Sequence, residues 1–317
     1  MDAPKSTTSE RAERAPMKSS ISRPRNGHCS GSAFRRRVCW LAAAVRTKKM
    51  SQQARHDAWH AGANYDIYMG RWSRKVAPRF LDWLNPSDHL DWLEIGCGTG
   101  ALSGTIMARC NPASFTGVEP SAGFLQQART NVADERAQFL VGDAQALPVA
   151  SHAKDMIVSG LVLNFVPDKE KALTEMKRVA RRGATVAFYV WDYPGGGMEF
   201  MRAFWRAAIA LDPNARDLAE DRRFPFCTRE ALIGLATSNG LTSVDCTAIE
   251  VPTVFKDFDD FWQPFTLGAG PAPGYCMSLD RDHRERLKER ISQSLTRTHD
   301  GSIPLKARAW ALRGVVS

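Results

Sequence analysis

A short apolar stretch that runs directly into a cluster of glycines is the feature that most constrains this chain. Leu90–Ile95 has the length and character of a buried strand, and Gly96, Gly98 and Gly100 follow it before a helical segment at Leu102–Arg109. Glycine allows a tight turn and lets a ligand approach the backbone closely. A strand, a glycine turn and a helix in this order predict a flat, polar ligand bound over the turn of an α/β fold.

Strand and helix patterns alternate from Met50 onward, which is typical of one layered domain with a mainly parallel sheet. Pro78 is expected near the start of one helix and Gly183 at the C-cap of another. Further strands are predicted at 114–118, 138–141, 156–159, 185–191, 242–251 and 306–313, the last two adjacent and antiparallel at the sheet edge. Further helices are predicted at 76–84, 121–132, 168–181, 198–211 and 229–238.

The folded domain is predicted to span 50–317, with lid helices over 50–85, a ligand-binding core over 86–192 and a substrate-side half over 193–317. An insert at 255–303 separates the last two strands and is too long for a hairpin turn. It is rich in aromatic residues and contains a charged helix. Two interpretations of it stand: a cover over the substrate, or a helical hairpin that only packs on the core.

The net charge of +9 comes entirely from the first 49 residues. They carry twelve Lys and Arg against three acidic residues, whereas residues 50–317 hold 31 of each sign. A neutral folded body gives no electrostatic footprint for a phosphate backbone. We therefore expect no nucleic-acid partner for the domain.

Residues 1–49 are rich in Arg, Ser and Ala and lack a sustained apolar period, so a disordered basic tail is predicted. An organelle transit peptide and a nucleic-acid patch at Arg35–Arg37 are alternatives. The sequence favours another interpretation, in which translation starts at Met50 and residues 1–49 come from a start codon that was assigned too far upstream. A motif-bearing fold begins just after that methionine.

Seven scattered cysteines, with no C-x-x-C pair and no histidine at zinc-ligand spacing, predict a reducing, cytoplasmic location and no structural metal. The apolar run at Val38–Val45 has eight residues. A membrane span needs about 20. No membrane span is therefore expected.

The glycines alone do not choose between two ligands. Gly96-x-Gly98-x-x-Ala101 also satisfies the dinucleotide fingerprint, and Glu119 lies near the place expected for its ribose acid, so an NAD(P)-binding oxidoreductase is an alternative. Glu94 argues against a dinucleotide. A carboxylate beside the turn would repel a pyrophosphate but would attract a cationic amino group, directly or through water.

Two further strand ends carry polar groups. Gly142-Asp143-Ala144 places an acid where it can accept a hydrogen bond from an adenine amino group. Ser159-Gly160 ends the following strand, where exposed carbonyls could also bind that amino group.

Together these features resemble the class I S-adenosylmethionine-dependent methyltransferase family, strongly over 60–190 and more weakly over 190–317. The resemblance implies a Rossmann-like α/β fold: a seven-stranded, mainly parallel sheet with an antiparallel last strand and helices on both faces. It also implies S-adenosyl-L-methionine as the cofactor. The motifs that carry it are Glu94-Ile-Gly-Cys-Gly-Thr-Gly100, Gly117-Val-Glu119-Pro-Ser121, Gly142-Asp143-Ala-Gln-Ala-Leu-Pro148 and Asp155-Met-Ile-Val-Ser159.

The resemblance also implies roles for single residues. Glu119 would hold both ribose hydroxyls, and Asp143 the adenine amino group. Gly96 and Gly98 would let the backbone pass under the methionine tail, and Pro120 or Leu147 would wall the adenine. The predicted cofactor-binding residues are Glu94, Gly96, Cys97, Gly98, Glu119, Pro120, Asp143, Ala144 and Ser159.

Candidates on the acceptor side are few. Residues 65–72 precede the first core strand, where such enzymes often carry a lid helix, and they are similar to the small-molecule branch that includes quinone-biosynthesis C-methyltransferases. Aromatic packing is the alternative role for this stretch. Asn164 lies near the expected methyl-transfer position, or else fixes its loop. The possible substrate or lid residues are Tyr65, Tyr68, Arg71, Asn164 and Asp192; His56, His60, Asp192 and Tyr193 are candidate bases by location, and none is assigned.

The predicted function is methyl transfer to a small, partly apolar acceptor by direct displacement. No D/N-P-P-Y/F motif follows the fourth strand, which disfavours nucleobase amino-methylation. A non-catalytic interaction module on the same fold is the remaining alternative. It is disfavoured because a degenerate pocket would be free to lose both acids. The sequence leaves open the acceptor, the methylated atom and the oligomeric state.

Overall fold

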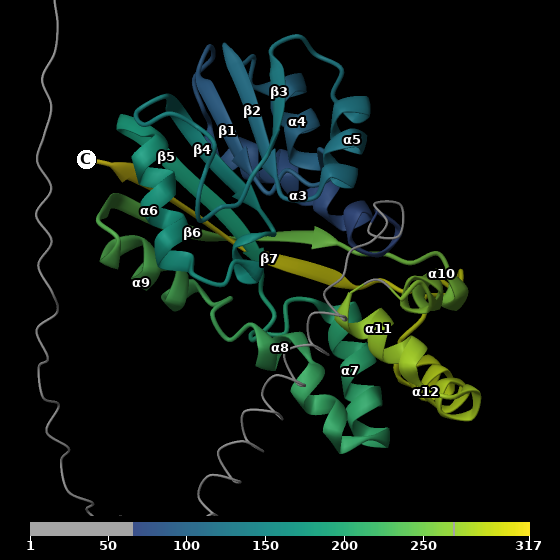
Figure 1. Ribbon diagram of the computed structural model, residues 1–317. Coiled ribbons are helices and arrows are strands. Elements are labelled where there is room, and N and C mark those ends of the chain that lie inside the picture. The colour runs from purple at the N-terminus through teal and green to yellow at the C-terminus, as the bar shows by residue number, and fades with distance from the viewer. Residues whose placement is uncertain (1–65, 269) are drawn as a thin grey trace, which may run out of the picture. The chain divides into compact units, whose positions relative to one another are not determined.

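The computed structural model describes residues 66–268 and 270–317. Their centre is a seven-stranded sheet with strand order β3-β2-β1-β4-β5-β7-β6 (Figure 1). Strands β1 to β5 pair in parallel, and β7 is antiparallel to both of its neighbours, which confirms the predicted fold class. The strands are β1 (Asp91–Ile95), β2 (Ser114–Glu119), β3 (Ala137–Val141), β4 (Lys154–Gly160), β5 (Ala180–Trp191), β6 (Leu241–Pro252) and β7 (Lys306–Val316).

The register of the sheet decides which residues meet at its edge. Ile95 pairs with Val118, and Glu119 pairs with Val141, so β1, β2 and β3 end close to one another. Parallel strands carry their carboxyl ends to the same edge, where ligands of open α/β sheets bind. The segments that follow β1, β2, β4 and β5 therefore gather around one place.

Helices cover both faces of the sheet. Helices α3, α4 and α5 pack together on one face, and α6 and α9 pack together on the other (Figure 1). Side-chain caps fix where some of them begin: Ser121 Oγ accepts a hydrogen bond from the Phe124 amide at 3.3 Å, at the start of α5. The helices are α3 (Arg71–Leu84), α4 (Ala101–Arg109), α5 (Ala122–Asn131), α6 (Lys169–Val179), α7 (Glu199–Leu211), α8 (Glu220–Arg223), α9 (Arg229–Ser238), α10 (Phe258–Trp262), α11 (Pro271–Ser278) and α12 (Arg281–Ser294). Single turns lie at η1 (Asp66–Gly70), η2 (Leu163–Phe165), η3 (Pro213–Leu218) and η4 (Gln263–Thr266).

Helix α3 differs from the sequence prediction, because it begins at Arg71 rather than at Val76. Pro78 therefore lies inside the helix and not near its start. Proline removes the hydrogen bond to the carbonyl four residues earlier. That carbonyl belongs to Arg74, an exposed residue, so water can replace the lost donor. Burial of the apolar side of α3, including Phe80, outweighs the cost of the proline.

Gly183 is not the helix C-cap that the sequence predicted. Helix α6 ends at Val179 and β5 begins at the next residue, so the glycine lies within the strand. Its φ is 82°, in the left-handed region that glycine adopts readily. The register between β4 and β5 shifts at this point, which indicates a bulge that the glycine accommodates.

The predicted insert at 255–303 contains α10, η4, α11 and α12. Phe261 and Phe265 are fully buried, and Phe265 stacks on Phe204 of α7 with ring centroids 4.4 Å apart. These aromatic side chains therefore pack against the rest of the fold, as the helical-hairpin interpretation expects. Pro271 at the start of α11 is different, because it lines a small cavity described below.

Two other sequence expectations concern features of the whole chain. Within the described residues, no helix is long and apolar enough to cross a membrane. In the same part of the chain, no three or more His, Cys, Asp or Glu side chains are placed to hold a metal ion.

Candidate functional site

A cavity of about 320 Å³ lies at the carboxyl edge of the sheet, over the glycine turn. Its size and mixed lining suit a small polar ligand with apolar parts. Segments far apart in the sequence build it: 96–99 after β1, Glu119 and Pro120 at the end of β2, 160–162 at the end of β4, Tyr189 of β5, Ser73 of α3 and Phe124 of α5.

The glycine turn forms one wall of this cavity, which we call the cofactor cavity. Gly96, Gly98 and Gly100 have φ values of 71°, 53° and 89°, which other residues adopt only with strain. A methyl group added at Gly96 would lie 2.4–2.9 Å from three side-chain carbons of Val162. At Gly98, no described atom lies within 4 Å of such a group, so this backbone is open to a ligand.

Glu119 is held at the end of β2 by two backbone amides. Its Oε2 accepts a hydrogen bond from Gly98 N at 3.2 Å and its Oε1 from Ser121 N at 3.0 Å. The side chain is largely buried, and this burial raises the pKa of the carboxyl group, although the two amides oppose the shift. Each oxygen keeps a further lone pair, so the group can accept hydrogen bonds from two hydroxyls of a ligand.

Glu94 lies beneath the turn on β1 and is 2% exposed. Burial raises its pKa to about 8, with nearby Glu119 adding to the shift and a 2.5 Å hydrogen bond from Ser103 Oγ opposing it. Since this pKa exceeds the usual 4.5, the protonated group stabilises the ligand-free fold, and that contribution is lost as the pH rises toward 8. A cationic ligand group beside Glu94 would favour its ionised form.

Of the other predicted cofactor-binding residues, some line the cofactor cavity and some do not. Cys97 and Pro120 line the cavity. Asp143 and Ala144 lie outside the lining, and Asp143 Oδ1 accepts a hydrogen bond from Gln145 N at 2.7 Å. Ser159 is buried below it, where its Oγ donates to the Ile95 carbonyl at 2.9 Å and ties β4 to β1. Their binding roles stay predictions.

The predicted lid residues lie in different places. Tyr65, like the candidate bases His56 and His60, falls outside the described residues. Arg71 forms a bidentate ion pair with Asp260, at 2.7 and 3.0 Å, which joins α3 to α10. Tyr68 is buried and lines the small cavity mentioned above.

Asn164 and Asp192 are both buried. Asn164 is 6% exposed, and its Nδ2 has no hydrogen-bond partner among the described residues. Asp192 is 1% exposed and is already engaged: Oδ2 lies 2.6 Å from the Arg308 guanidinium, and Oδ1 accepts from Gly195 N at 2.9 Å. This pairing anchors the loop after β5 to β7, so Asp192 has a structural role here.

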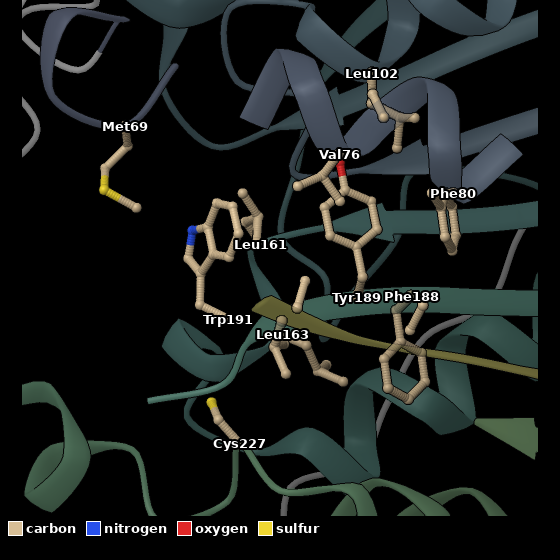
Figure 2. Packing of buried hydrophobic residues seen from close by; sticks show 14 of the residues in the cluster. Met69, Val76, Phe80, Leu102, Leu161, Leu163, Phe188, Tyr189, Trp191 and Cys227 are labelled. Atoms are coloured by element: carbon tan, nitrogen blue, oxygen red, sulfur yellow. The ribbon is translucent and has the colours of Figure 1, made fainter. Parts of the chain in front are cut away.

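Several lining residues were missed from the sequence, among them Ser73, Phe124 and Tyr189. Tyr189 and Trp191 project to the same side of β5, and Phe188 projects to the other (Figure 2). This alternation is the normal period of a strand. Tyr189 lines the cofactor cavity and Trp191 the small cavity, so the two cavities follow one another along the same face of β5.

The fold and the site define a protein class. A dinucleotide-binding sheet has the strand order 3-2-1-4-5-6. Here an antiparallel β7 lies between β5 and β6, which gives the class I methyltransferase fold. A solved structure from Bacillus halodurans shares this fold with a TM-score of 0.51 over 76% of this chain and 98% of that one, at 10% identity.

Sequence comparison defines the family. A methyltransferase-domain family profile matches residues 93–188. A malonyl-acyl-carrier-protein O-methyltransferase of Geobacter sulfurreducens is 29% identical over 60% of this chain and 70% of that protein. A demethylmenaquinone methyltransferase of Roseiflexus is 39% identical over 30% of this chain, a match that spans only 40% of the relative. The chain is a class I S-adenosylmethionine-dependent methyltransferase, and S-adenosylmethionine is its methyl donor.

We expect the affinity for S-adenosylmethionine to rise about tenfold per pH unit between pH 6 and 7.5. If the amino group of the donor binds beside Glu94, whose pKa is about 8 in the free protein, binding must expel one proton in this range. Titration calorimetry in two buffers of different ionisation enthalpy measures that proton. Glu94→Gln is the matched control and should show a flat profile. Wild-type binding without proton release would place the amino group elsewhere.

Proposed function

We propose that this enzyme transfers the methyl group of S-adenosylmethionine to a small-molecule acceptor by direct displacement. The observation that carries the proposal is the small cavity beside the cofactor cavity, because both are lined by Leu161 and Phe165. An acceptor in the small cavity would lie next to the methyl group of a bound donor.

The chemistry requires little from the protein beyond alignment. A lone pair of the acceptor forms a bond to the methyl carbon while the carbon–sulfur bond breaks, and the sulfonium leaves as a neutral thioether. Because the leaving group is already activated, holding the nucleophile, methyl and sulfur in line supplies much of the rate. The apolar walls, such as Leu161 and Phe165, exclude water that would compete for that position.

The lining of the small cavity supports a partly apolar acceptor. Its walls are mainly aromatic and aliphatic side chains. The relatives act on chemically different acceptors, as their names state: a malonyl group on a carrier protein in one case and a demethylmenaquinone in the other. Likeness to them therefore supports the reaction and leaves the acceptor to be identified from the site.

Binding measurements on the full chain test the cofactor part of the proposal. We expect calorimetry to show saturable binding of S-adenosylmethionine and of its demethylated product, and none of NADH. The sheet supports this expectation, because β7 lies between β5 and β6, an order that differs from the 3-2-1-4-5-6 order of dinucleotide-binding sheets. Saturable NADH binding, or no binding of either sulfur compound, would contradict the proposal.

A labelling experiment tests the acceptor part. The purified enzyme and methyl-labelled cofactor are added to a native extract, which is then separated by ultrafiltration. We expect label in the small-molecule fraction, and none with a Glu119→Ala variant whose cofactor site is impaired. Label found only in protein or nucleic acid would show that the acceptor is a macromolecule.

A further inference from the structure

Two buried polar atoms on residues that line the small cavity have no hydrogen-bond partner in the described part of the chain. They are Trp191 Nε1, a donor, and Glu220 Oε1, an acceptor. Each residue is 2% exposed. Figure 2 shows the indole nitrogen on the edge of the Trp191 ring that is turned toward Met69, another residue of the lining. Buried polar groups are nearly always paired, so these two atoms are available to hydrogen-bond a polar group that enters the cavity.

Glu220 is held so that one carboxylate oxygen remains available. It begins the short helix α8, and its Oε2 accepts a hydrogen bond from Trp205 Nε1 of α7. Its Oε1 atom is buried without a partner among the described residues, and Glu220 lines the cavity together with Tyr68, Tyr193 and Phe224. None of the described lining residues is a lysine or an arginine.

Aromatic faces combined with a single carboxyl group suit one ligand chemistry best. Aromatic rings attract cations through their quadrupoles, and a carboxylate pairs with an ammonium group by a charge-assisted hydrogen bond. An anionic acceptor would be repelled by Glu220. The indole N–H of Trp191 in addition calls for an oxygen acceptor on the same molecule.

We propose that Glu220 and Trp191 form the acceptor site for a small amine that also carries an oxygen atom, and that Glu220 is the catalytic base. This inference rests on the proposed methyl transfer. An ammonium N–H bond breaks and its proton passes to Glu220 Oε1. The freed lone pair then forms the nitrogen–methyl bond as the carbon–sulfur bond breaks. The products are a methylated ammonium ion, the neutral thioether and one proton, which Glu220 returns to solvent.

The charge state of Glu220 fits this role. Burial raises its pKa to about 7, while the hydrogen bond from Trp205 and the charge of Arg223 oppose the shift and Asp221 adds to it. The other titratable groups lining the cavity are the phenols of Tyr68 and Tyr193. A base with a pKa near the working pH combines a useful ionised fraction with enough proton affinity. Amine methylation should therefore increase as the pH rises through about 7.

The cavity holds only about 20 Å³ as it stands, so an acceptor must widen it. Met69 and Met201 lie in its wall, and methionine side chains change rotamer easily. Tyr193, Met201 and Glu220 also line an outer cleft of about 240 Å³, which provides a route from solvent. Arg202 and Arg206 line that cleft, so an anionic acceptor is the alternative to be tested.

Three matched probes distinguish the possibilities: 2-phenoxyethylamine, 2-phenoxyethanol and phenoxyacetate. They share a ring and an ether oxygen and differ in one group, an ammonium, a hydroxyl or a carboxylate. Calorimetry on the full chain saturated with the demethylated cofactor should show the amine binding at least tenfold more tightly than the alcohol, and phenoxyacetate most weakly. Glu220→Gln should remove that preference and the rise of amine methylation near pH 7.

Trp191→Phe keeps the ring but loses the N–H, and should weaken all three probes about equally. Glu230→Gln, at an exposed position of α9, is the control and should behave as wild type. The affinity for the demethylated cofactor should stay within twofold of the wild-type value in every variant. This measurement separates the amine site from the proposed function, because a wild-type protein that does not bind the cofactor would overturn the proposed function instead. Three outcomes would overturn the amine site. Phenoxyacetate could bind more tightly than the amine, or the preference for the amine could survive in Glu220→Gln. The third outcome is that no probe binds, because a single water fills the cavity.

Discussion

Replacing Gly96 with alanine is expected to weaken cofactor binding at least 100-fold and to lower the free energy of unfolding by about 2–5 kcal/mol. Two penalties add at this position. The backbone φ of 71° disfavours any side chain, and the new methyl group would overlap three carbons of Val162. Relief requires the turn or the 160–162 segment to move, and both line the cofactor cavity.

Denaturant unfolding and calorimetry of the variant measure the two effects. Gly183→Ala is the matched control, because it has a φ of 82° with no described atom within 4 Å of the added group and lies away from the cavity. It should lose only about 1–2 kcal/mol and bind cofactor normally. The double variant Gly96→Ala/Val162→Ala should recover part of the lost stability. Equal losses for both single alanine variants would mean that the contact with Val162 is unimportant.

Replacing Glu119 with alanine is expected to weaken S-adenosylmethionine binding 100-fold or more. The two carboxylate oxygens are predicted to accept hydrogen bonds from both ribose hydroxyls, and hydrogen bonds to charged groups are worth about 1.5–3 kcal/mol each. The variant also leaves the amides of Gly98 and Ser121 without their present acceptor. Calorimetry measures the loss of affinity, and thermal unfolding checks that the fold survives.

Asp143→Ala is the comparison for that measurement. Asp143 lies outside the lining and its carboxylate bonds to Gln145, so we expect a smaller effect of about tenfold, from one hydrogen bond to adenine. Unchanged affinity in both variants would mean that the cofactor binds elsewhere. Equal losses would show that the loop after β3 contributes as much as the end of β2.

The sequence was most informative where chemistry depends on neighbours along the chain. The sequence from Ile95 to Gly100 was enough to predict a tight turn, because a strand, three glycines and a helix in succession permit few other backbone conformations. Glu94 and Glu119 were predicted from their positions near the ends of two strands, beside the turn and at the expected ribose acid, and both line the cofactor cavity. Helix α9 was predicted with its observed bounds, Arg229–Ser238.

Other features depend on contacts between distant segments. Arg71 pairs with Asp260, 189 residues away, and Asp192 pairs with Arg308, 116 residues away, so neither ion pair has a local signal. Glu220 lies on a four-residue helix in a stretch without clear periodicity, and only the fold brings it to the same cavity as Trp191. The alternation of aromatic residues in β5 is the one signal that was available for Tyr189.

The place of β7 in the sheet has a consequence for how the protein is made. This strand lies between β5 and β6 and pairs with both, yet it follows them in the chain. On the ribosome, β5 and β6 are synthesised while the strand that joins them is still missing, so each exposes an unpaired edge that can associate with other chains. We expect the nascent enzyme to need chaperone protection until residues 306–316 leave the exit tunnel.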